Sequence, residues 1–223
     1  MRLILCPLQI ELDWVRSIFQ ERGFSLIEKS LAAKLSYWQS SEGWLLASGG
    51  HGKINYALRA SRILTSLPAI ESVICLGAAG GLGPQVSPLD VVVGTESIEH
   101  DFKPASPKVP RPIVKADGEL LAQAREYRPM DFQVHFGPIA SGDEDIQSSE
   151  RVEALLEQTA ALAVAWEGMA AAKACRHFGK KFLEIRGVTD LCSSHLLSEF
   201  GKNLERAIKN ATEVALSSHS HDL

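Results

Sequence analysis

The stretch FLEIRGVTDLCSS, residues 182–194, is the segment from which we predict the fold. Its apolar residues are typical of a buried strand: Phe182, Leu183, Ile185 and Val188. The apolar run stops at Thr189 and Asp190, and small and polar residues follow. In open α/β sheets, ligands bind at the carboxyl ends of the strands. A carboxylate delivered to that edge by a buried strand is therefore a candidate for binding or chemistry.

The rest of the chain alternates strand and helix patterns. Apolar, β-branched runs predict strands at 2–6, 71–83 (running into glycines), 89–102, 132–140, 161–166 and 182–188, and a hairpin at 35–50. Helical spacing or capping residues predict helices at 11–22, 53–67, 118–127, 149–159, 167–179 and 199–217. This alternation predicts an α/β fold of three layers (α/β/α), with a mixed, largely parallel central sheet and helices on both faces. We expect one domain, residues 1–223.

Composition limits the partners. The net charge is −4, from 23 basic and 27 acidic residues, which does not favour nucleic acid or an anionic membrane as a partner. No apolar run approaches the roughly 20 residues that a membrane-spanning helix needs. The four cysteines show no metal-ligand spacing and indicate reduced thiols in a cytoplasmic protein. We therefore expect a small-molecule ligand and neither a metal nor a cofactor.

Several strand ends carry polar or glycine-rich segments. Glu11 follows the strand predicted at 2–6, and the glycines of GAAGG (77–81) follow the apolar residues 72–76. SGD (141–143) follows the strand predicted at 132–140, and Glu167 follows the one at 161–166. Each has an ordinary structural alternative. The glycines are typical of a tight turn, and Asp190 is a candidate helix cap. Glu11 and Glu167 are typical of the first turn of a helix, where a negative charge is favourable. Only their order and joint spacing point to one cleft.

That set resembles the nucleoside phosphorylase/nucleosidase family, and most closely its 5′-methylthioadenosine/S-adenosylhomocysteine nucleosidases. The segment VAWEGMAAAKACRHFGKKFLEIRGVTD (164–190) is similar to the family pattern VEMEA…AxxC…F…PFxxxRxxSD. CLGAAGGL (75–82) resembles NxGxAGGL, and SGGHGKINYALRASRIL (48–64) resembles SGIGKVNAA. PLQIELDWV (7–15) and ASGDEDI (140–146) resemble AMExEV and xSGDxFI.

The resemblance implies a role for each matching residue. Asp190 would protonate purine N7, Glu11 would activate a water, and Glu167 would hold the ribose hydroxyls, chiefly the 2′-OH. The remaining residues implied for the substrate site are Ala78, Ala79 and Gly80 on the sugar side, the backbone of Ile146 at the purine edge, and Thr189 beside the acid. Protonation of a leaving group needs a carboxylic acid with a raised pKa, and attack by water needs a second carboxylate in a different environment. The implied reaction is hydrolysis of an N-glycosidic bond by a homodimeric enzyme.

Water is the favoured nucleophile because Ile74, Cys75 and Leu76, which precede the glycines, supply no cation for phosphate. Two departures concern specificity. Asp145 stands where the family has a purine-stacking aromatic residue, and such stacking is worth about 1–3 kcal/mol. Ala165 replaces the first Glu of VEMEA, and Trp166 replaces Met and offers another surface for the base.

Alternative functions remain open at this point. One is a nucleoside phosphorylase, or a hydrolase of the futalosine type, with another base preference. Another is a catalytically silent nucleoside-binding homologue, which the retention of Glu11, Glu167 and Asp190 disfavours, because idle buried carboxylates cost desolvation. The proline-rich loop at 103–112 is a candidate for a subunit interface or a lid.

Overall fold

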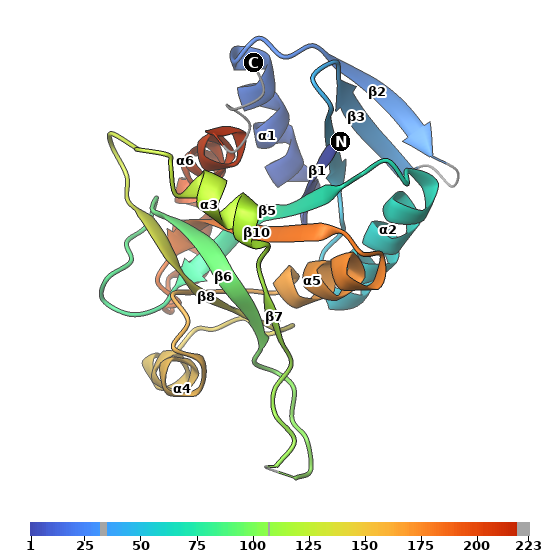
Figure 1. Cartoon of the computed structure of the whole chain (residues 1–223). Helices are drawn as coiled ribbons and strands as arrows, with labels where there is room; N and C mark the ends of the chain where they lie inside the picture. Colours follow the sequence, from blue (N-terminus) through green and yellow to red (C-terminus); the bar gives the residue numbers. More distant parts are fainter. Residues whose placement is uncertain (32–34, 107, 218–223) are drawn as a thin grey trace.

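The computed structural model describes residues 1–31, 35–106 and 108–217. Within them, one mixed sheet is flanked by helices on both sides, as the alternation of patterns predicted (Figure 1). The strands are β1 (Arg2–Cys6), β2 (Leu26–Leu31), β3 (Leu35–Ser40), β4 (Trp44–Ser48), β5 (Ser72–Gly81), β6 (Val91–Glu99), β7 (Ile113–Lys115), β8 (Val134–Ser141), β9 (Ala163–Ala165) and β10 (Lys181–Asp190). The helices are α1 (Gln9–Glu21), α2 (Lys53–Ser66), α3 (Gly118–Ala124), α4 (Ser149–Thr159), α5 (Gly168–His177) and α6 (Leu196–Ser217).

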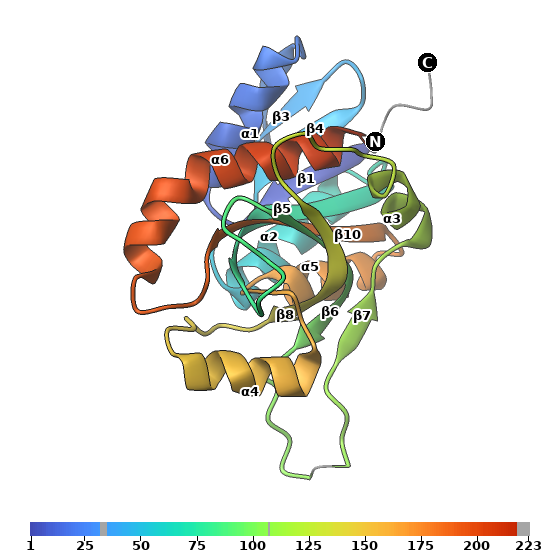
Figure 2. The same cartoon turned by 90° about the vertical axis from the view of Figure 1, so that its left-hand side faces the viewer.

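The centre of the sheet is parallel. β4, β1, β5 and β10 are neighbours in that order, and each adjacent pair runs parallel. Helices α1 and α6 lie on one side of these strands, and α2 and α5 lie on the other (Figures 1 and 2). Each side has its own apolar core. Because both faces are covered, the central strands are nearly continuous runs of buried apolar residues.

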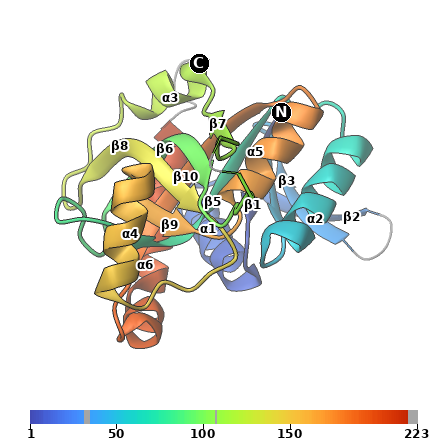
Figure 3. The same cartoon turned by 90° about the horizontal axis from the view of Figure 1, so that it is seen from below.

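Part of the sheet closes into a ring. β5 pairs with β9, β9 with β8, β8 with β6, β6 with β10, and β10 with β5 again. A separate apolar cluster takes residues from all of these strands, including Ala79, Val92, Ile139, Ala163 and Val188. Helix α4 lies beside β8 and β9 on the outside of the ring (Figure 3). The alternating patterns gave no indication of this closure.

Several element ends differ from the sequence expectation. The strand predicted to stop before Asp190 continues through it, because Asp190 still pairs with Gly80 across a register shift. Two strands were not predicted. β2 is mostly exposed at the sheet edge and lacks an apolar face, and β7 is three residues long. Ser148 caps α4: its side chain accepts a hydrogen bond from the backbone N–H of Arg151.

No helix among the described residues combines the length and apolar character that crossing a bilayer requires. The four cysteines are free and buried. The described residues hold no cluster of His, Cys, Asp or Glu side chains arranged for a metal ion. The loop expected as an interface or lid, 103–112, contains residue 107, which lies outside the described residues. The rest of that loop connects β6 to β7 and extends away from the sheet (Figures 1 and 2).

Candidate active site

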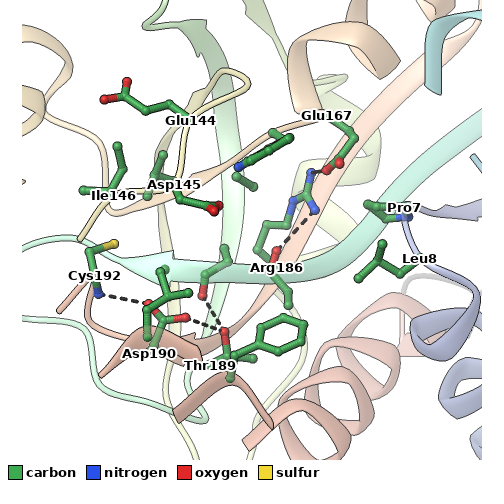
Figure 4. Close-up of a pocket in the computed structure, with 18 of the residues that line it drawn as sticks. Pro7, Leu8, Glu144, Asp145, Ile146, Glu167, Arg186, Thr189, Asp190 and Cys192 are labelled. Atoms are coloured by element: carbon green, nitrogen blue, oxygen red, sulfur yellow. Dashed lines mark hydrogen bonds and ion pairs between the residues drawn. The ribbon is translucent and has the colours of Figure 1, made fainter. Parts of the chain in front are cut away.

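A cavity lies at the carboxyl ends of β1, β4, β5, β8, β9 and β10. The residues predicted to act in catalysis or to bind the substrate all line it: Glu11, Ala78, Ala79, Gly80, Asp145, Ile146, Trp166, Glu167, Thr189 and Asp190. Pro7, Leu8, His51, Ala165, Arg186, Cys192 and Phe200 are among the other lining residues. Figure 4 shows part of this lining, with side chains from several separate elements facing a common space.

Glu11 is held from two sides by backbone N–H groups. The N–H of Leu8 donates to Oε2 at 2.7 Å, and the N–H of Ala78 donates to Oε1 at 2.8 Å. The side chain sits in the first turn of α1, directly after β1, and is almost completely buried. Burial raises the pKa of Glu11 to about 7, although both backbone hydrogen bonds lower it. A carboxylate with such a pKa changes its protonation state near neutral pH.

Asp190 lies at the end of β10 in a different environment. Thr189 Oγ1 donates to Oδ2 at 2.8 Å, and the backbone N–H of Cys192 donates to Oδ1 at 2.9 Å (Figure 4). Burial raises the pKa of Asp190 above its ordinary value, and both hydrogen bonds oppose that shift. Asp190 does not cap α6, which begins at Leu196, so its structural alternative finds no support here.

Gly80 allows the close approach of this segment to β5. A Cβ atom at Gly80 would collide with Cys192 Sγ and lie 3.2 Å from Asp190 Oδ1. Cys192 itself has a φ of 56°, a left-handed conformation that is uncommon for a residue with a side chain. The chain therefore turns tightly just after Asp190 and keeps the carboxylate against the glycine segment.

Glu167 follows β9 and precedes α5. The N–H of Gly52 donates to its Oε1 at 3.0 Å, and His51 Nδ1 lies 3.3 Å from the same oxygen. Ser141 fixes the segment around it: its Oγ donates to the carbonyl of Trp166 at 2.9 Å and accepts from the N–H of Met169 at 2.8 Å. The SGD segment therefore supports the site from behind.

Asp143, the acid of the same SGD segment, is not part of the cavity lining. Its Oδ1 accepts a hydrogen bond from the backbone N–H of Lys53 at 2.9 Å, at the start of α2. The structural alternative holds for this residue, which anchors a helix terminus.

Arg186 is the functional candidate that sequence reasoning missed. It lies on β10 and is fully buried, and its guanidinium reaches the glycine segment, where Nη1 lies 3.3 Å from the carbonyl oxygen of Ala78. The expectation that this segment has no cation nearby was therefore wrong. The available signal was a single arginine inside an apolar strand, since a buried charge requires partners.

Acidic groups surround that guanidinium. Nε donates to Glu184 Oε1 at 2.8 Å. Nη2 lies 3.7 Å from Glu167 Oε2, on the side shown in Figure 4. Glu184 is itself fully buried and accepts a short hydrogen bond from Ser97. The positive charge of Arg186 is thus offset inside the protein before any ligand arrives.

Asp145 differs from the other carboxylates. Figure 4 shows its side chain directed into the cavity, on the side of Ile146. The residue is exposed, and its negative charge contributes to the raised pKa of Asp190. Trp166 lies elsewhere on the lining and stacks on His51, with ring centroids 4.3 Å apart and an interplanar angle of 26°. Asp145, Ala165 and Trp166, which differ from the family pattern, therefore line the same cavity as the carboxylates.

Comparison with known proteins agrees with this arrangement. A family model described as the phosphorylase superfamily matches residues 21–218. The 5′-methylthioadenosine/S-adenosylhomocysteine nucleosidase of Thermotoga maritima is 32% identical over 189 residues, which cover 83% of this chain and 84% of the relative.

Solved structures give the same result. The nucleosidase of that name from Neisseria meningitidis, in complex with methylthio-immucillin-A, superposes with a TM-score of 0.84 at 26% identity, over 100% of this chain and 99% of the other. A futalosine hydrolase from Helicobacter pylori shares the fold, with a TM-score of 0.85 at 23% identity, and the match covers 100% of this chain and 97% of the other. With its mixed sheet, its cavity at the strand ends and these matches, the chain belongs to the phosphorylase superfamily.

Proposed function

We propose that this protein hydrolyses the N-glycosidic bond of a purine nucleoside, with 5′-methylthioadenosine, S-adenosylhomocysteine or a related 5′-modified adenosine as the substrate class. The observation that carries the proposal is the set of three buried carboxylates in one cavity, each with different partners. Asp190 acts as the general acid, Glu11 as the general base, and Glu167 holds the ribose. The similarity to nucleosidases over most of the chain supports the same assignment.

Protonation of the base comes from Asp190. Burial raises the pKa of Asp190 above its ordinary value, and the carboxyl group in its protonated form donates a proton to the purine and turns the base into a better leaving group. Thr189, within hydrogen-bond distance of Oδ2, orients the carboxyl group, while the backbone of Ile146 faces the purine edge. Proton transfer by one positioned group contributes about two to four orders of magnitude in rate.

Water attacks on the opposite side, activated by Glu11. The sugar carbon gains positive charge as the glycosidic bond breaks, and the nearby carboxylates Glu11 and Glu167 stabilise that charge. The sugar lies along Ala78, Ala79 and Gly80. Glu167 accepts hydrogen bonds from the ribose hydroxyls through Oε2, since Oε1 already receives the N–H of Gly52.

The enclosure of Arg186 supports water rather than phosphate as the nucleophile. A phosphate dianion at this place would meet Glu11 and Glu167, while the guanidinium is already paired with Glu184. Charge-assisted binding of phosphate needs cations with free donors.

The free, buried cysteines also fit the expectation of a cytoplasmic enzyme.

Release of free base, followed by chromatography, tests the proposal. Purified protein is incubated with methylthioadenosine, adenosylhomocysteine, adenosine, inosine and futalosine, with and without phosphate. We expect adenine from the thioethers at the same rate in both conditions. Release only with phosphate would instead identify a phosphorylase, and silence on every nucleoside would leave a binding protein.

One observation favours a second candidate, a hydrolase with another base preference. Asp145 places a carboxylate in the cavity where an aromatic ring would stack on adenine. A carboxylate accepts hydrogen bonds and favours a base that presents N–H donors to it. Release of hypoxanthine, with no adenine from the thioethers, would select this candidate.

A further inference from the structure

His51 and Gly52 together form a contact with Trp166 and Glu167, two residues that are also adjacent in the chain. The ring of His51 stacks on Trp166, its Nδ1 lies 3.3 Å from Glu167 Oε1, and the N–H of Gly52 donates to that oxygen at 3.0 Å. Two adjacent residues, His51 and Gly52, therefore both contact the same carboxylate oxygen of Glu167.

The backbone of this segment adopts a conformation that most residues avoid. Gly50 and Gly52, on either side of His51, have φ values of 85° and 83°. Glycine tolerates this region without steric cost. The segment leads from β4 to α2, and the turn it makes directs both the imidazole and the N–H of Gly52 at Glu167.

The opposite side of the contact is equally fixed. Ser141 holds the carbonyl of Trp166 and the N–H of Met169, so the turn that carries Glu167 is tied to β8. Trp166 offers its ring as a flat support on which the imidazole lies. The orientation of His51 is thus determined by a stack on one face and a carboxylate at one edge.

Glu167 has a competing partner on its other side. Arg186 Nη2 lies 3.7 Å from Oε2, and both side chains are almost completely buried. A carboxylate free to rotate would close on the guanidinium, because a buried ion pair gains from a shorter distance. Oε2 would then be unavailable for a sugar hydroxyl.

We infer that His51 is a positioning residue for Glu167: its Nδ1–H holds Oε1, keeps the carboxylate apart from Arg186, and leaves Oε2 free for the ribose. The inference rests on the proposed function, in which Glu167 binds the 2′-hydroxyl. The distance of 3.3 Å is that of the unliganded site, where hydrogen bonds of active-site groups are often long. The side chain of His51 is 56% exposed, so the inferred role does not make it part of the core.

Three variants separate the two ring nitrogens. In His51→Asn the side-chain amide nitrogen is the same number of bonds from Cα as Nδ1, and in His51→Gln it reaches toward the place of Nε2. His51→Ala removes both. His177→Ala is the matched control, since His177 is an exposed histidine in edge-to-face contact with Phe178, and it lies outside the cavity.

The rates are measured on 5′-methylthioadenosine and on its 2′-deoxy analogue. We expect His51→Ala and His51→Gln to lower kcat/KM on the ribonucleoside about 10- to 100-fold, the effect of losing a hydrogen bond to a charged group. His51→Asn recovers most of that loss, and His177→Ala has none. On the 2′-deoxy analogue all variants stay close to the wild type. Calorimetry measures the Kd of both nucleosides for the same variants, each combined with Asp190→Asn so that the nucleoside is not cleaved. We expect the Kd values to rank the variants in the same order as kcat/KM does.

Two results would overturn the inference alone. In the first, the wild type is active and His51→Ala is equally active. In the second, His51→Ala loses the same factor on both nucleosides and Asn does not rescue it, which indicates direct contact with another part of the substrate. If the wild type neither binds nor cleaves these nucleosides, the proposed function fails first and the inference with it.

Discussion

Asp190 and Glu11 have different neighbours, and in the proposed reaction Asp190 gives a proton while Glu11 takes one. For Asp190→Asn we expect turnover to fall about two to four orders of magnitude, because an amide cannot donate the proton that the departing base requires. Nucleoside binding should persist, since the variant keeps the shape of the cavity. The measurements are base release and calorimetric Kd. Turnover that survives the change would exclude Asp190 as the acid.

The raised pKa of Glu11 leads to a prediction for the pH dependence of the rate, on the acid limb of the pH profile. A base must be ionised, and burial raises the pKa of Glu11 to about 7, so kcat/KM should rise with pH through that value. The profile is measured on the free enzyme at low substrate concentration. Glu11→Gln should lower the rate and remove this limb. A limb centred near the ordinary value of a glutamate would mean that water reaches the carboxylate and relieves its burial.

The residues missed from the sequence share a physical reason. Glu11, Glu167 and Asp190 were found because each follows a strand, and strand ends converge in such sheets. Arg186 lies inside a strand, and its role depends on Glu184 and on Ala78, which belongs to β5. His51 matters through its contact with residues 166 and 167. Contacts between distant parts of the chain have little effect on the local pattern of apolar and polar residues.

At the scale of elements, the start of α5 packs directly on the buried pair of Glu184 and Arg186. A Cβ atom at Gly168 would collide with the carboxylate of Glu184. We expect Gly168→Ala to destabilise the protein on the order of 3 kcal/mol, because it displaces one member of a buried ion pair. Urea denaturation measures the change.

Gly118 supplies the matched control for that prediction. Like Gly168 it is the first residue of a helix, but nothing lies within 4 Å of a Cβ atom placed there. Gly118→Ala should be neutral or stabilise by up to about 1 kcal/mol, because alanine favours helix. A change at Gly168 as small as the one at Gly118 would show that movement of the helix relieves the collision.

Buried helices and strands were predicted from the sequence more readily than exposed or short ones. Central strands and amphipathic helices were recognised, since covered faces impose an apolar period. β2 was missed because four of its six residues are exposed, and β7 because three residues are too few to establish a pattern. The ring closed by β5 and β10 was not predicted either, because register between distant strands is set by tertiary packing.

At the scale of the whole molecule, the homodimer implied by the resemblance remains a prediction. Ile54 and Leu58, one turn apart on α2, are 75% and 66% exposed, which is typical of a surface covered by a partner. For Leu58→Glu we expect the dimer to dissociate into monomers, as measured by light scattering. Ile27→Glu, at an equally exposed position on β2, is the control and should leave the mass unchanged. A monomeric wild type would contradict the prediction.

The closed ring has a consequence for the exchange of amide hydrogens with solvent. β10 pairs with β5 on one side and, at Glu184–Gly187, with β6 on the other; it carries Arg186 and ends at Asp190. Its amides should exchange only when the ring as a whole opens, while those of residues 191–195, which lie outside the strands, should exchange sooner. Arg186 and Asp190 would then leave the cavity lining only on global unfolding. Local opening of residues 191–195 would leave the strand that carries Asp190 in place.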